Sequence, residues 1–276
     1  MEVGSRLWLF ALLLLLFAYL TAGRVIGGTK WAAKKGSAWK TRGGSISDEI
    51  AQSGVESGGI KATSESQQEI EDTFLQGTFK CVESGEEYRV RQVPGDGGCL
   101  FHALTVSLMY DKTKSHRLFD DDMRKMSERL RKLAVLLLKR ENVTLFIENG
   151  ESTTSSDLLR IVSDHYNMTP EAYCDQMLLP TSWGGGPEIV SLSNHLQRPV
   201  HVFELSPLEL EEGADLKMCS ENACKFFGIK ICGQFGSPEF DEEEPLFILC
   251  ADGRFPHSLD IDVSKPGDHF LCLHKL

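Results

Sequence analysis

The chain of 276 residues lacks an excess of basic charge. It has 29 Lys and Arg against 40 Asp and Glu, which gives a formal net charge of −11. A protein that binds nucleic acid presents a basic face to the phosphate backbone. We therefore expect no nucleic-acid partner, whereas the acidic surface is compatible with a basic protein partner.

Closely paired cysteines are also missing. The chain has eight cysteines, but Cys219, Cys224 and Cys232 lack the short paired spacing of a zinc site. A chain of this length and low cysteine density does not need disulfides to fold. Apolar residues surround Cys250 and Cys272, as expected for free buried thiols. The sequence therefore predicts no metal site.

No internal repeat is visible, and one long apolar run occurs, from Leu7 to Ala22. This run is short for a membrane span, which usually needs about 17–25 residues, and fits the core of a signal peptide. Basic residues follow the run in excess, beginning with Arg24, so the positive-inside bias places the rest of the chain in the cytosol. We expect residues 1–24 to be a signal peptide or signal anchor, and we favour a membrane-anchored, cytosol-facing domain, for example at the endoplasmic reticulum.

Other fates of this segment stay open. Cleavage or organelle targeting would leave the protein in the cytoplasm or an organelle after loss of the segment. Glycans on the sequons at Asn142 and Asn167 would instead indicate a luminal domain.

Residues 25–76 are rich in Gly, Ser, Lys and Glu, and their hydrophobic residues follow no sustained period. This composition is typical of a flexible linker, with at most a short helix near Gln67–Phe74. We expect ordered structure to begin near Phe79, within a folded domain over residues 77–276.

Hydrophobic periodicity in this domain predicts helices in its first half and strands in its second half. A long helix starts after the acidic residues Asp120–Asp122 and ends at Lys139–Arg140, as the helix dipole prefers. This order indicates an α+β fold or a three-layer α/β/α sandwich-like domain. Further helices are expected at 99–110, 157–166, 170–178 and from 187, and strands at 88–93, 199–205, 246–250 and 269–273.

Two glycines precede Cys99, which opens an apolar helical run. A cysteine at a helix N-terminus feels the positive end of the dipole, and this lowers its pKa below the free value of roughly 8.5. Gly97 and Gly98 allow backbone N–H groups to approach the sulfur, where an oxyanion could be held. The alternative interpretation is a tight turn in which Cys99 is a small buried hydrophobe.

A reactive thiol needs an imidazole as its base, and eight histidines compete for this role. His102 lies on the same helix as Cys99, and its side chain is expected to point away from the cleft. His269 follows Pro266-Gly267-Asp268 and opens an apolar strand, so a rigid element would hold it at the edge of a sheet. His269 is therefore the favoured base.

Three segments together resemble one family. Asp96-Gly97-Gly98-Cys99-Leu100-Phe101 resembles the Asp-Gly-x-Cys signature of the ovarian-tumour (OTU) cysteine proteases. Trp183-Gly184-Gly185-Gly186-Pro187-Glu188-Ile189 resembles their Trp-Gly-Gly-x-x-Glu segment, and His269-Phe270-Leu271-Cys272-Leu273 their terminal histidine strand. The three occur in the family's order over residues 80–276, and the small size is similar to that of the short plant-type members.

The resemblance implies a papain-like architecture of the OTU type and a deubiquitinase that acts on ubiquitin or polyubiquitin conjugates as a monomer, with no cofactor. It implies Cys99 as the nucleophile and His269 as the general base. The Asp96–Cys99 loop, with Gly97 and Gly98, would form the oxyanion hole, and Asp96 would shape this loop or join the triad. Trp183 would shape the cleft.

One position departs from the family pattern. Many members carry Asp or Asn two residues after the histidine to orient it, and this chain has Leu271 there. Asp96, Asp268 or a backbone carbonyl would have to replace that group. Two alternatives therefore stay open: a weak or inactive membrane-tethered ubiquitin-binding OTU module, and a secreted thiol enzyme with unrelated substrates.

Overall fold

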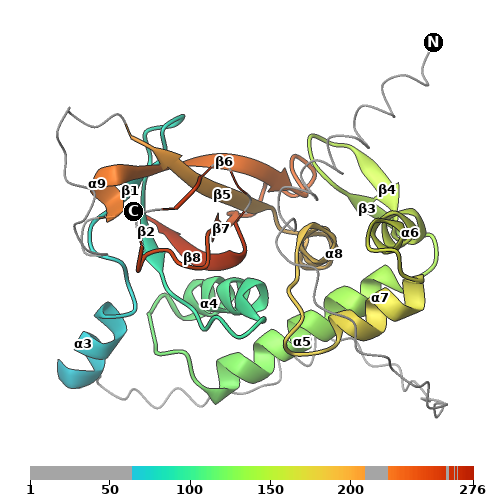
Figure 1. Ribbon diagram of the computed structural model, residues 1–276, viewed down its shortest axis with the longest axis horizontal. Coiled ribbons are helices and arrows are strands. Elements are labelled where there is room, and N and C mark those ends of the chain that lie inside the picture. Colours follow the sequence, from blue (N-terminus) through green and yellow to red (C-terminus); the bar gives the residue numbers. More distant parts are fainter. Residues whose placement is uncertain (1–63, 209–222, 259–260, 264, 266) are drawn as a thin grey trace.

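The computed structural model describes residues 64–208, 223–258, 261–263, 265 and 267–276. The helices and strands form one mixed arrangement, with a curled sheet beside a group of helices (Figure 1). In chain order the elements are α3 (Ser64–Glu71), β1 (Phe79–Lys80), β2 (Glu87–Arg91), α4 (Cys99–Thr113), α5 (Asp121–Leu138), β3 (Thr144–Phe146), β4 (Ser152–Thr154), α6 (Ser155–His165), α7 (Pro170–Met177), α8 (Gly186–Leu196), β5 (Val200–Pro207), α9 (Ala223–Phe226), β6 (Phe227–Phe235), β7 (Leu246–Ala251) and β8 (His269–Lys275).

The main sheet has six strands in the order β1-β2-β8-β7-β5-β6. Neighbouring strands are antiparallel except β5 and β7, which run parallel. The sheet curls until its two edges meet, because Cys81, just after β1, forms a bridge with Ile229 of β6. The N–H of Val82 also donates to the carbonyl of Ile229 at 2.9 Å. The last strand of the chain, β8, therefore lies in the middle of a nearly closed sheet.

Side chains alternate along β8 between two apolar cores. Phe270 and Cys272 belong to the core between the sheet and the helices, whereas Leu271 and Leu273 belong to the core inside the curl. This is the two-residue period of a strand that is covered on both faces. His269 therefore projects to the same side of the sheet as Leu271.

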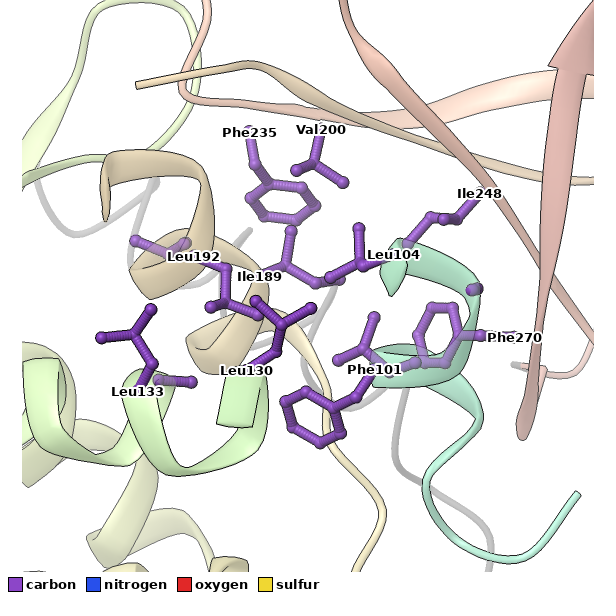
Figure 2. Packing of buried hydrophobic residues seen from close by; sticks show 14 of the residues in the cluster. Phe101, Leu104, Leu130, Leu133, Ile189, Leu192, Val200, Phe235, Ile248 and Phe270 are labelled. Carbon is purple, nitrogen blue, oxygen red and sulfur yellow. The ribbon is translucent and has the colours of Figure 1, made fainter. Parts of the chain in front are cut away.

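Helix α4 packs against the sheet and carries Cys99 at its first residue. Phe101 and Leu104 of this helix meet Leu130 of α5 and Ile189 of α8 (Figure 2). All four side chains are almost fully buried, so the apolar burial that stabilises the fold also fixes the start of α4 relative to α5 and α8.

The expected long helix is confirmed as α5. The side chain of Asp120 caps it by accepting a hydrogen bond from the N–H of Met123 at 2.9 Å, and Asp121 and Asp122 lie in its first turn. The α+β class is also confirmed, with helices over one face of the sheet.

The expected linker boundary at residue 76 falls inside packed structure. Helix α3 lies within residues 64–71, and Phe74 and Leu75 are each 5% exposed. The N–H of Leu75 donates to the carbonyl of Val90 in β2 at 2.9 Å. These two side chains join the folded part because the edge of the sheet near β2 offers both apolar contacts and a free carbonyl.

Within the residues that the structure describes, no helix is long and apolar enough to cross a membrane. The run from Leu7 to Ala22, on which the membrane prediction depends, lies outside the described residues.

Candidate active site

A cavity of about 340 Å³ opens where the loop before α4 meets the start of β8. Four parts of the chain form its wall: the loop before α4 together with Cys99, Trp183 in the segment before α8, the turn after β7, and the residues around the start of β8. Of the predicted site residues, Gly97, Cys99, Trp183 and His269 line this cavity. The other lining residues are Gln92, Val93, Gly95, Gly253, Phe255, Pro256, His257, Asp268 and Leu271.

Cys99 begins helix α4 and is 4% exposed. Burial raises the pKa of its thiol, although backbone amides of Phe270, Leu100 and Cys99 itself favour the thiolate. The expectation of a lowered pKa is therefore wrong for this geometry, because desolvation of the charged sulfur outweighs the amides at the helix start.

Gly97 must be glycine for two reasons. Its φ is +90°, a left-handed conformation, and a Cβ there would lie 2.5 Å from the carbonyl oxygen of Thr181. The loop before Cys99 thus rests directly on the backbone that leads to Trp183. This contact positions two walls of the cavity against each other.

Asp96 does not reach His269 in this structure. Its carboxylate accepts hydrogen bonds from His102 Nε2 at 2.8 Å, from Arg124 Nη1 at 2.6 Å and from the N–H of Gly98 at 3.1 Å. Burial acts to raise its pKa, but the hydrogen bonds from Arg124 and His102 prevail and lower the pKa to about 2. Asp96 therefore ties the loop to α4 and α5.

His102 is the partner of Asp96 that the sequence reasoning missed. It lies outside the cavity lining, as expected, but its buried ring holds Asp96 rather than packing as a plain core residue. The spacing of Asp96 and His102 could have indicated this contact, since an acid in the loop and a histidine on the first turn of the following helix can face each other.

Replacement of Asp96 by Asn is expected to destabilise the fold by about 0.5–1.5 kcal/mol at pH 7, because the partly exposed ion pair with Arg124 is screened by solvent. The pKa of Asp96 is depressed in the folded state, so its contribution is present above about pH 4 and is lost as the pH falls toward 2. Urea unfolding of wild type and Asp96→Asn at pH 7 and pH 2.5 measures this. A stability difference that stays constant across this range would contradict the assignment.

His269 is the first residue of β8, and its ring faces Gly95, on which a Cβ would lie 3.6 Å from Cε1 of the ring. Burial lowers its pKa, the charge of Asp268 acts to raise it, and His102 lowers it further. Among the described residues, no side chain donates to or accepts from the ring. The Asp268 carboxylate instead accepts from the N–H of Gly253.

Leu271 occupies the position where many family members are expected to carry an acid or amide. It is 1% exposed and belongs to the core inside the curled sheet. A carboxylate at this place would be buried among apolar side chains, which is costly without a partner. The interior packing of the curl therefore accounts for leucine here.

Comparison with known proteins shows the family of this chain. A family model described as OTU-like cysteine protease matches residues 94–234, slightly more than half of the chain. The chain belongs to the OTU-like cysteine protease family. The match includes Cys99 and Trp183 and ends before His269.

Solved structures of OTU domains are similar to this chain at low identity. The OTU of Hazara virus bound to ubiquitin is 19% identical, with a TM-score of 0.39, over 73% of this chain and 87% of that one. An ovarian-tumour domain in complex with ubiquitin is 16% identical, with a TM-score of 0.38, over 72% and 76%. An OTU deubiquitinase of Wolbachia pipientis bound to ubiquitin is 17% identical, with a TM-score of 0.33, over 68% and 96%. No curated protein matches the chain.

Proposed function

We propose that this protein is a deubiquitinating cysteine protease that cleaves the isopeptide or peptide bond after the C-terminal glycine of ubiquitin in conjugates. The observation that carries the proposal is that Cys99, at the start of a helix, and His269, at the start of a strand, line one cavity. Membership of a cysteine protease family supports the same chemistry.

The cavity wall is compatible with a substrate that ends in glycines. Gly95, Gly97 and Gly253 contribute no side chains, while Trp183, which is 53% exposed, stands on another side. Because these glycines carry no side chains, the backbone of an extended substrate can lie close to this part of the wall. The two glycines at the end of ubiquitin can form a backbone of this kind.

The proton is expected to rest on sulfur before the reaction. Burial raises the pKa of Cys99 and lowers that of His269, so both groups favour their neutral forms. His269 then acts as a general base that takes the thiol proton as the sulfur attacks the carbonyl carbon. The tetrahedral oxyanion forms beside the start of α4, where backbone N–H groups stabilise it.

Collapse of this intermediate breaks the C–N bond and leaves a thioester on Cys99. The protonated imidazole of His269 gives its proton to the departing amine. Water, deprotonated by His269, then attacks the thioester carbon; the C–S bond breaks, the imidazolium returns the proton to sulfur, and the ubiquitin carboxylate leaves. No step requires a metal or an organic cofactor.

Reaction of the full chain with ubiquitin that carries a C-terminal electrophile tests the proposal. We expect a covalent adduct that increases the mass by one ubiquitin and is absent when the last two glycines of the probe are replaced by alanines. A folded wild-type protein that forms no adduct would overturn the proposal. Since no described side chain orients the ring of His269, the alternative would then be favoured, a ubiquitin-binding module without activity. Retention of ubiquitin on the protein would reveal such binding.

A further inference from the structure

Arg131 is a buried cation that the reaction described above does not use. It lies in α5 and is 4% exposed. In the part of the chain that the structure describes, no carboxylate contacts its guanidinium group. All four of its hydrogen bonds to oxygen go instead to backbone carbonyls, two from each terminal nitrogen.

One of these carbonyls belongs to the loop before Cys99, and the other three belong to residues 177–182, the segment that leads to Trp183. Nη2 donates to the oxygen of Gly97 at 3.0 Å and to that of Pro180 at 3.1 Å. Nη1 donates to the oxygens of Met177 at 3.0 Å and Ser182 at 2.7 Å. One side chain therefore joins the loop before Cys99 to the segment that leads to Trp183.

The guanidinium plane also contacts the nucleophile helix. Its central carbon lies 4.4 Å from the ring centroid of Phe101, two residues after Cys99. Stacking on an aromatic face and a rigid fork of donors are properties of arginine that lysine lacks. The contacts around Arg131 thus depend on the planar shape of its side chain as well as on its charge.

The bond to Gly97 controls the orientation of one peptide plane. The carbonyl of this peptide accepts from Arg131, and its N–H, on Gly98, donates to Asp96. A peptide group is planar, so holding both polar ends sets its rotation. The next peptide carries the N–H of Cys99, one of the amides beside the sulfur.

We propose that Arg131 is a positioning residue that sets the N–H of Cys99, which would bind the oxyanion, and the spacing between the loop before Cys99 and the Trp183 wall. The inference rests on the proposed thiol chemistry. It does not require that the substrate be ubiquitin.

Arg131→Lys keeps the positive charge and removes the planar set of N–H donors of the guanidinium group. The matched control is Arg160→Lys, which makes the same change on the exposed face of α6. We expect Arg131→Lys to lower kcat for a fluorogenic ubiquitin C-terminal amide by about 10- to 100-fold, because a small displacement of the oxyanion donors has that scale of effect. Alkylation of Cys99 by iodoacetamide forms no oxyanion, so its rate and pH profile should change much less. Arg160→Lys should match wild type in both.

Two results would overturn the inference. One is wild-type kcat in Arg131→Lys. The other is an equal fall of kcat and alkylation rate that follows the fraction of folded protein, which would show a structural role alone. If Arg131→Lys does not fold, Phe101→Leu is tested instead, because it removes the stacking face and keeps the guanidinium group. In this variant kcat should again fall more than the rate of Cys99 alkylation, by a smaller factor than in Arg131→Lys.

A small ester separates this inference from the proposed function. Hydrolysis of 4-nitrophenyl acetate by Cys99 also passes through an oxyanion. If wild type cleaves the ester but does not react with the ubiquitin probe, the substrate assignment fails while Arg131 is still tested on the ester. Equal ester turnover by wild type and Arg131→Lys would contradict the positioning role.

Discussion

Cys99→Ala is expected to lower kcat for a ubiquitin C-terminal amide by more than about 10⁴-fold, because removal of the nucleophile leaves only background stabilisation by the rest of the site. The substitution removes one sulfur from a buried position at the start of α4, and the helix itself is compatible with alanine. The melting temperature should therefore change little. Turnover measured at equal concentrations of folded protein checks the expectation.

Cys224→Ala is the matched control for the loss of a thiol. Cys224 is half-buried in α9, is a free cysteine and does not line the cavity. The Cys224→Ala variant should turn over substrate at the wild-type rate. Activity retained in Cys99→Ala, or lost equally in Cys224→Ala, would show that the nucleophile is another group.

His269→Gln is expected to lower kcat/KM by about 10²–10⁴-fold, the range that general acid–base catalysis contributes. Because burial lowers the pKa of His269 below its usual 6.5, the neutral base should persist into mildly acidic solution. Wild-type kcat/KM should then fall only as the pH decreases below 6.5. The pH profile of kcat/KM from pH 4.5 to 9 measures this acidic limb.

The acidic limb should disappear in His269→Gln, since glutamine does not titrate. His257→Gln is the matched control, because His257 also lines the cavity but follows β7 rather than opening β8. It should keep the wild-type limb. An acidic limb that is unchanged in His269→Gln, or that is removed in His257→Gln, would assign the base elsewhere.

Much of the arrangement around Cys99 could be predicted because its signals are local. A glycine pair before an apolar helix, the acidic cap of α5 and the apolar strand after His269 each depend on a few neighbouring residues. Strand β6 was missed, because Gly228, Lys230 and Gly233 interrupt its apolar pattern. The short strands β3 and β4, with three residues each, give too little periodicity to recognise.

Arg131 could not be recognised from the sequence. On a helical pattern it stands beside apolar residues, where an arginine is normally a solvated neighbour of the buried face. Its burial is favourable only because four carbonyls converge on it, one from the loop before α4 and three from the end of α7 and the segment that follows it. The same holds for the pKa of Cys99, since the helix start is visible in the sequence while the extent of desolvation depends on the whole fold.

The central place of β8 has a consequence for folding. This strand follows every other strand in chain order, yet it pairs with β2 on one side and β7 on the other. Pairing between distant segments is slow, because a long loop must close before the contacts are made. The sheet therefore cannot close during synthesis until β8 has left the ribosome. Since β8 also brings His269, the chain acquires its proposed base and its completed sheet in one event, and partly made chains carry the Cys99 thiol without His269.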